Sequence, residues 1–247
     1  SAYTLMVFLI SILLGVSMGS GTVFSLQYGA GDLSALRRSI YVSFLLIGTV
    51  TILLNVAVFL WLDPILRWLQ VPYDIYSLMR NYLWIIFWGI VFTFLYNFYA
   101  ALLRAVGDSV TPLWFLAVSV VLNIGLDLFL ILVLDQGIEG AAVATVIAQG
   151  TAASGILLYT YKIRPELRLH REDMRFDRSS LREITSFSTL TCVQQSVMNF
   201  GILMVQGLVN SFGTVVMAAF AAAVKIDSFA YMLVQEFGNA FSTFIAQ

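Results

Sequence analysis

The chain has 247 residues, of which 60% are hydrophobic and only 11% are charged, and its mean hydropathy is +0.90. A soluble domain usually carries about 25% charged residues, so lipid has to be the solvent for part of this apolar surface. The formal net charge of −1 gives no reason to expect a nucleic-acid partner. A single cysteine, Cys192, excludes an intrachain disulfide framework and a cysteine-only zinc site.

Several segments are long and apolar enough to cross a membrane as helices, which takes roughly 20 residues each. Helix is the expected state, because an unpaired backbone amide in hydrocarbon costs several kcal/mol. In chain order the segments are about 3–27, 40–62, 80–103, 112–134, 138–162, 185–210 and 216–247. Turn signals separate them at Gly29–Asp32, Asp63–Pro64, Gly107–Pro112, Gln136–Gly137 and Ser211–Gly213. We therefore predict an all-α membrane protein, a polytopic bundle of transmembrane helices, and we expect the chain to be a piece of a longer protein.

Positive charges fall on alternate sides of these segments, and cytoplasmic loops are the ones enriched in Lys and Arg. Ten of the 13 lie on one side, namely Arg37, Arg38, Arg104, Lys162, Arg164, Arg168, Arg171, Arg175, Arg178 and Arg182. The other side has Arg67 and Arg80, and Lys225 lies within a span. We therefore predict a multi-pass protein of the inner (plasma) membrane, with loops 28–39, 104–111 and 163–184 in the cytoplasm. Segment 163–184, in which Arg alternates with Asp and Glu, is interpreted as a solvated linker between two bundles.

The stretch from Asn97 to Pro112 contains Leu-Arg-Ala-Val-Gly-Asp-Ser-Val-Thr-Pro. This motif resembles the "LRA-x-GD-x-x-TP" signature of the multidrug and toxic compound extrusion (MATE) family. Gln27–Asp32, Asn123–Asp127 and Gly140–Gln149 resemble further parts of that family, in the same order along the chain. The likeness therefore covers the whole chain rather than one turn.

The resemblance implies helices two to eight of a twelve-helix, two-lobe transporter whose lobes are related by a parallel repeat. The first lobe is then 1–162 without helix one, the inter-lobe linker 163–184, and the start of the second lobe 185–247. The implied function is export of organic, often cationic, drugs in exchange for Na⁺ or H⁺, without enzymatic activity or a bound cofactor, and as a monomer. The alternative is a flippase of lipid-linked intermediates with a related architecture. It would need a strongly cationic central cavity, and the first-lobe spans have no Lys or Arg in their interiors.

Asp127 is a carboxylate inside a span, and such charges are functional by default. Asn123 lies one turn before it on the same helix face, and Thr145 lies on the next span. Asp127 is seven residues before the end of its span and Thr145 seven after the start of the next, so antiparallel packing predicts that they face each other. Carboxylate, amide and hydroxyl oxygens suit Na⁺, and a carboxylate alone suits H⁺. The resemblance assigns Asn123, Asp127 and Thr145, with an Asp on helix one, to the cation site; the alternative is a buried polar cluster that joins two helices.

Two later segments carry polar stripes that we interpret as lining a substrate cavity, with helix-to-helix bonding as the alternative. The first stripe comprises Ser188, Gln195, Asn199, Gln206 and Asn210, and the second Lys225, Ser228, Met232, Glu236, Asn239 and Thr243. The predicted substrate-cavity residues are Gln195, Asn199, Gln206, Lys225 and Glu236. Glu236 is either a second proton-linked carboxylate or the partner in an interhelical hydrogen bond.

One motif of hydrolases does occur, because residues 15–19 fit the nucleophile-elbow pattern G-x-S-x-G. That elbow needs a strand-to-helix turn and a nearby histidine, whereas Ser17 lies in an apolar helix and His170 in the linker. We therefore reject a serine hydrolase and expect Gly15 and Gly19 to allow close contact between helices.

Overall fold

The computed structural model describes residues 2–68 and 73–210 and scattered positions between 220 and 245, and the two long stretches are almost entirely helical. The helices are α1 (Ala2–Gly29), α2 (Leu33–Trp68), α3 (Tyr73–Trp88), α4 (Ile90–Ala105), α5 (Val110–Leu128), α6 (Gly137–Ile163) and α7 (Arg178–Asn210). A π-helical turn, η1 (Phe129–Val133), continues α5, and a short 3-10 helix, η2 (Pro165–Leu167), follows α6. The predicted all-α class is confirmed.

Four helical stretches in the described part of the chain are long and apolar enough to cross a membrane: Leu33–Pro64, Tyr76–Ala105, Val110–Val133 and Gly137–Ile163. They match the second to fifth predicted segments. The first and sixth predicted segments are also helical, within α1 and α7. The seventh, 216–247, lies outside the continuously described residues.

The predicted turn at Asp63–Pro64 is wrong, because α2 continues through Pro64 to Trp68. Proline removes one intrahelical hydrogen bond and bends a helix, but packing against neighbours can hold such a helix together. Here the Asp63 carboxylate receives hydrogen bonds from the Tyr76 hydroxyl at 3.0 Å and from Arg80 Nε at 2.8 Å. These bonds join the end of α2 to α3 beside the proline.

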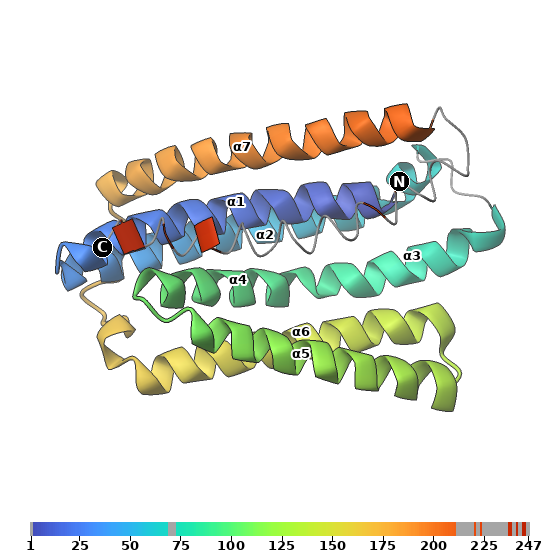
Figure 1. Ribbon diagram of the computed structural model, residues 1–247, viewed down its shortest axis with the longest axis horizontal. Helices are drawn as coiled ribbons and strands as arrows, with labels where there is room; N and C mark the ends of the chain where they lie inside the picture. Colours follow the sequence, from blue (N-terminus) through green and yellow to red (C-terminus); the bar gives the residue numbers. More distant parts are fainter. Residues whose placement is uncertain are drawn as a thin grey trace.

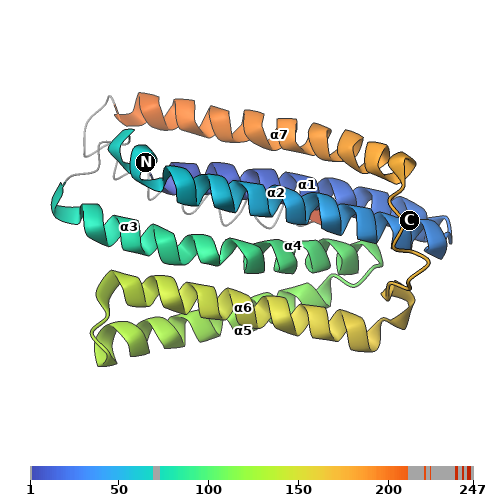
Figure 2. The ribbon, with the colours of Figure 1, turned by 180° about the vertical axis from the view of Figure 1, so that it is seen from behind.

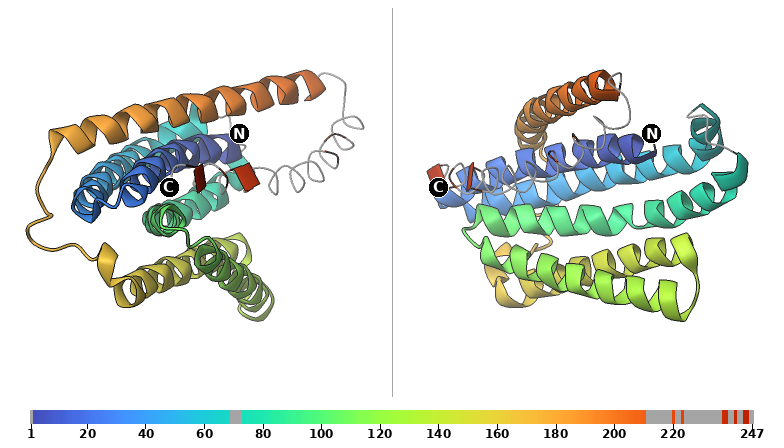
Figure 3. Two further views of the ribbon diagram at one scale, coloured as in Figure 1. Left: turned by 60° about the vertical axis from the view of Figure 1, so that its left-hand side comes forward. Right: turned by 45° about the vertical axis from the view of Figure 1, so that its right-hand side comes forward.

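The helices lie roughly parallel in layers (Figure 1), with α7 outermost, then α1 and α2, then α3 and α4, and finally α5 and α6. The reverse view shows the same order (Figure 2). The connection from α6 to α7 runs past the intervening layers at one end of the bundle, so that α7 packs on α1 and α2 rather than on α6 (Figure 3). The turns after α1 and α4 lie at that same end, and the α5–α6 turn lies at the opposite end. The three segments predicted to be cytoplasmic are therefore neighbours in space.

The main core lies between α1, α2, α3 and α4. Its centre is a cluster of aromatic rings in which Phe44 contacts Phe94 and Phe98, each with ring centroids 5.4 Å apart, and Phe98 meets Phe24 edge-on at 6.1 Å. Phe24 and Phe98 are fully buried. The aromatic residues at this level of α4 therefore contribute packing.

The outer helices present apolar side chains to the surroundings instead of burying them. On α5, Val118, Val121, Ile124 and Leu128 are all more than half exposed. A water-facing helix would not carry this apolar surface, whereas a lipid-facing helix requires it. The structure is that of a multi-pass membrane protein.

Candidate cation site

The site predicted from the sequence is built on the hairpin of α5 and α6. The connection between them is tight: Gln136 donates its backbone N–H to Leu130 O at 3.0 Å, and Asp135 and Gly137 have φ values of 51° and 56°. Glycine adopts this left-handed backbone without strain, and aspartate tolerates it. The short connection makes α5 and α6 antiparallel neighbours, as expected.

Asn123 and Thr145 meet across this hairpin. Asn123 Nδ2 lies 3.5 Å from Thr145 Oγ1, at the long limit of a hydrogen bond in which the amide donates. The Thr145 hydroxyl donates its own proton to Ala141 O at 2.9 Å, which fixes its rotamer. The hydroxyl oxygen therefore keeps acceptor capacity toward the space between the helices.

Asp127 lies one turn along α5 from Asn123, and its side chain is partly buried. Its Oδ1 atom is shielded from solvent and has no hydrogen-bond partner. A buried carboxylate oxygen without a partner is unfavourable, and a cation, a proton or a further hydrogen-bond donor would satisfy it. The oxygens of Asp127, Asn123 and Thr145 are of the type that a hard cation prefers.

The direct bond across the hairpin is made by Asn123. That Asp127 also faces Thr145 stays a prediction, which came from equal residue counts in the two spans. Equal residue counts correspond to equal depths only if every residue up to Leu134 has the rise of an α-helix. Instead, Phe129–Val133 form the π-helical turn η1, which has more residues per turn and a smaller rise. The segment after Asp127 is therefore not regularly α-helical up to Leu134, and nothing in the sequence indicated this.

No group of three or more His, Cys, Asp or Glu side chains that could hold a metal ion occurs among the residues that the structure describes. Of the predicted ligands in this hairpin, Asp127 offers a carboxylate, and Asn123 and Thr145 offer neutral oxygens. Such a ligand set matches an alkali cation or a proton better than a zinc ion.

The predicted substrate-cavity residues are only partly visible. Gln195 is half-buried on α7, with Nε2 3.8 Å from the sulfur of Met18 on α1. Asn199 and Gln206 belong to α7, but their side chains lie outside the described part of the structure, as do Lys225 and Glu236 altogether. Ser188, on the same stripe, is buried and donates to Val16 O on α1 at 3.3 Å. At Ser188 and Gln195 the stripe therefore joins helices.

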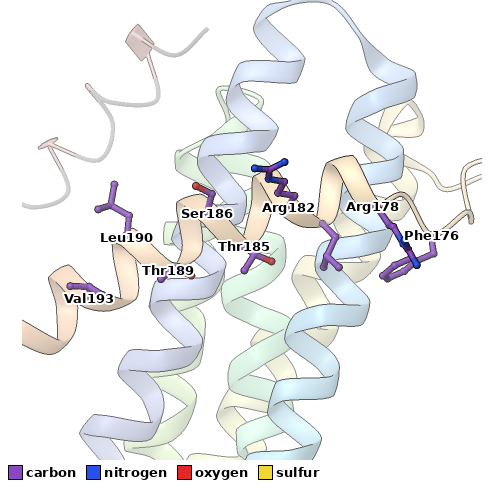
Figure 4. A pocket seen from close by; sticks show the side chains of 9 residues that line it. Phe176, Arg178, Arg182, Thr185, Ser186, Thr189, Leu190 and Val193 are labelled. Atoms are coloured by element: carbon purple, nitrogen blue, oxygen red, sulfur yellow. The ribbon is translucent and has the colours of Figure 1, made fainter.

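Two hollows border α7. One, of about 380 Å³, lies between α1, α2 and α7 and is lined by Val16, Leu46, Val50, Thr185, Ser188, Thr189, Cys192, Val193, Ser196 and Val197. The other, of about 900 Å³, is a groove along the start of α7 whose nine lining residues all fall between Phe176 and Val193 (Figure 4). Arg178 lies beside Phe176 at one end of this groove, Arg182 lies nearer its middle, and Leu190 and Val193 lie at the other end. Ser188, from the first polar stripe, lines the smaller hollow, and among the described residues none predicted to bind the cation lines either hollow.

A set of polar residues around Gly89, where the third span is interrupted between α3 and α4, was not predicted from the sequence. Thr93 Oγ1 donates to Gln149 Oε1 on α6 at 2.9 Å, and Asn55 Nδ2 on α2 donates to Phe87 O at 2.9 Å. Gln149 and Thr145 line one cavity of about 110 Å³. The available signal was the spacing of Gln149, which is one turn from Thr145 on the same helix.

Comparison with known proteins adds independent findings. The family model MatE matches residues 1–129. The probable multidrug resistance protein YpnP of Bacillus subtilis (strain 168) is 32% identical over 244 residues, which are 99% of this chain and 54% of that protein. Multidrug export protein MepA of Staphylococcus aureus (strain NCTC 8325) is 26% identical over 242 residues, 95% of this chain and 53% of its own. A crystal structure of MATE in complex with MaL6 superposes with a TM-score of 0.92 at 19% identity, covering 99% of this chain and 55% of that one. The chain thus spans about half the length of the relatives that it matches.

Proposed function

The chain belongs to the multidrug and toxic compound extrusion family, and on that premise we propose that it forms part of a secondary active antiporter. The exported substrate is an organic compound, often a lipophilic cation, and the driving ion is Na⁺ or H⁺. The transporter works as a monomer in the plasma membrane and needs no bound cofactor. Residues 1–162 supply the first lobe, 163–184 the cytoplasmic linker, and 185–247 the beginning of the second lobe.

One observation supports the ion-coupled mechanism above the others: the shielded, unpartnered Oδ1 of Asp127, beside the Asn123–Thr145 contact. In the proposed cycle the ion binds Asp127, Asn123 and Thr145 from outside and is released inside. Coupling requires that the ion bind the two conformations of the transporter with different affinities, since equal binding would shift no population. The drug leaves through a cavity to which Gln195, Asn199, Gln206, Lys225 and Glu236 contribute.

The alternative of a lipid-linked intermediate flippase receives no support from the relatives described above. YpnP and MepA are named for multidrug resistance and multidrug export. The interiors of the first-lobe spans also provide no Lys or Arg for a polyanionic lipid headgroup. Drug export is therefore the function that we propose.

The test is Asp127→Asn in the intact transporter, with efflux of ethidium measured under an imposed Na⁺ or proton gradient. We expect the variant to be made at a normal level and to lose gradient-driven efflux, because the amide cannot carry the charge that attracts the ion. The matched control is Asp135→Asn, the same change at an exposed turn position between α5 and η1 on one side and α6 on the other. Efflux at the parental rate by Asp127→Asn would show that Asp127 is structural. Comparing the two gradients identifies the coupling ion.

A further inference from the structure

The third span does not cross the bundle as one regular helix. α3 ends at Trp88, α4 begins at Ile90, and Gly89 between them donates its N–H to Ile86 O at 2.8 Å, a tighter turn than an α-helix has. Such interruptions alter the hydrogen-bond pattern of nearby backbone groups, and in a membrane neighbouring side chains have to satisfy any that are freed. This interruption is therefore a place where other helices can hold the span.

Two neighbouring helices form hydrogen bonds with the third span, one on each side of Gly89. The Asn55 side chain of α2 is buried and donates to Phe87 O at 2.9 Å. The Gln149 side chain of α6 accepts the Thr93 hydroxyl proton at 2.9 Å, and Thr93 Oγ1 is also 3.3 Å from Gly89 O. Polar bonds between helices are specific in lipid, because few alternative partners are available there.

At Gly89, α6 lies close to the backbone of the third span. A Cβ added to Gly89 would lie 3.0 Å from Val146 Cγ2 and 3.3 Å from Gln149 Oε1, so the absence of a side chain lets α6 approach closely. Val146 directly follows Thr145, and Gln149 lies one turn beyond it. Thr145 also lies between two bonds from α6 to the third span, since Asn81 Nδ2 donates to Glu139 Oε1 at 2.8 Å.

From this arrangement we infer that Thr93 and Gln149 are positioning residues for ion binding. Their hydrogen bond, at the Gly89 interruption, sets the depth and rotation of α6. It thereby places the Thr145 hydroxyl opposite Asn123. This inference rests on the proposed function, in which Thr145 is a ligand of the coupling ion. The inference gives the third span a role in ion affinity, although neither Thr93 nor Gln149 belongs to the predicted ion site. It also gives a reason for the polar pair at the interruption of the third span.

The test measures the half-saturating ion concentration for efflux in the intact transporter, or the pH of half-maximal rate if protons drive it. Thr93→Val and Gln149→Leu should each shift the ion dependence by about 2- to 10-fold, the range that loss of one hydrogen bond allows. The half-saturating drug concentration at saturating ion should not change. Thr93→Ser, which keeps the hydroxyl, should behave like the parent. The double variant should show no more than the single effect, because both changes remove the same bond.

The matched control is Thr151→Val, the same substitution on α6 at an exposed threonine whose hydroxyl bonds only to its own helix, at Ile147 O. Unchanged ion dependence in Thr93→Val and Gln149→Leu, with Asp127→Asn inactive, would overturn this inference and leave the proposed function intact. Ion-driven efflux in Asp127→Asn would instead overturn the proposed function.

A second measurement does not depend on transport. Backbone amide hydrogen exchange at residues 89–93 should be faster in Thr93→Val and Gln149→Leu than in the parent, Thr93→Ser or Thr151→Val, because the interrupted helix loses its contact with α6. Equal exchange in all five proteins would show that the bond does not hold the third span, and would overturn the inference even if transport were altered.

Discussion

At the scale of single residues, Asp108 is the charged side chain that organises one end of the bundle. It accepts hydrogen bonds from the backbone N–H of Thr111 at 3.0 Å and from the Thr111 hydroxyl at 2.8 Å, which cap the first turn of α5. Arg164 Nη2, just after α6, lies 3.6 Å from the same carboxylate. One side chain thus joins the beginning of α5 to the end of α6, which accounts for the Gly-Asp-x-x-Thr spacing in physical terms.

The protonation of Asp108 makes stability depend on pH. Partial burial acts to raise the pKa of Asp108, but the bonds from Thr111 and the charge of Arg164 outweigh it, so the pKa lies below the usual aspartate value. A carboxyl group whose pKa is lower in the folded state stabilises the fold above its unfolded-state pKa. That contribution disappears as the pH falls through the folded-state value.

We therefore predict that Asp108→Asn lowers the stability of the intact transporter at pH 7 by roughly 1 kcal/mol, the value of a partly exposed charged hydrogen bond. Thermal unfolding in detergent, followed from pH 7 to pH 3, measures the effect. The difference from the parent should shrink toward the acid end of the range. Glu172→Gln, an exposed neutralisation in the linker, should leave the unfolding temperature unchanged. A constant difference at every pH would contradict the assignment to the Asp108 charge.

At the scale of secondary-structure elements, the contact of α1 with α7 depends on small residues. The expectation that Gly15 and Gly19 serve close helix contact is confirmed: a Cβ at Gly15 would lie 2.7 Å from Cys192 Sγ, and one at Gly19 would lie 2.5 Å from Ser188 Cα. Gly19 faces backbone, which cannot move aside as a flexible side chain can. Helices in lipid gain stability from this close packing, because no hydrophobic driving force brings them together.

Gly19→Ala should therefore destabilise the intact transporter by about 1–3 kcal/mol, the usual cost of overpacking. Gly125→Ala on α5 is the matched control, because a Cβ there meets nothing within 4 Å. That control should be neutral or slightly stabilising, since alanine favours helix over glycine. The fraction of protein that remains monodisperse in size-exclusion chromatography after heating compares the two. Equal losses in both variants would mean that the α1–α7 contact has no special role.

At the scale of the whole molecule, the segments predicted to be cytoplasmic are tied together at one end. Arg37 Nε at the start of α2 donates to Glu166 O at 3.0 Å, and Arg164 bonds to Glu166 as well as to Asp108. The α5–α6 turn lies at the other end. This arrangement agrees with the alternation of Lys and Arg along the chain, and the positive-inside rule predicts which end faces the cytoplasm.

A cysteine scan of the intact transporter tests this sidedness. In a background lacking Cys192, a Ser179→Cys variant should resist a membrane-impermeant maleimide in intact cells and react after lysis. Gln136→Cys, at the exposed α5–α6 turn, should react in intact cells. Labelling of Ser179→Cys but not of Gln136→Cys before lysis would invert the topology, since both positions are exposed in the structure and differ only in the end of the bundle they occupy.

The sequence by itself determined the helical class, most span boundaries and the family motifs. This was possible because an apolar run of this length in lipid has to satisfy its own backbone hydrogen bonds, and only helix does so within one segment. It also indicated that Asn123, Asp127 and Thr145 belong to neighbouring helices, since a short connection forces α5 and α6 to be antiparallel. The roles of these three residues in ion binding remain predictions.

Only the tertiary structure decided the features that depend on contacts between distant segments. Asp63 bonds to residues of α3 beside the proline that was expected to end α2. A π-helical turn follows Leu128, and the direct bond from α5 to Thr145 comes from Asn123. The interruption at Gly89 and the pairing of Thr93 with Gln149 also came only from the structure. The spacing of Gln149 from Thr145 was a signal, but a polar residue in a span shows only that it needs a partner. Which partner it finds depends on helix rotation and depth, and these are set by packing across the bundle rather than by local sequence.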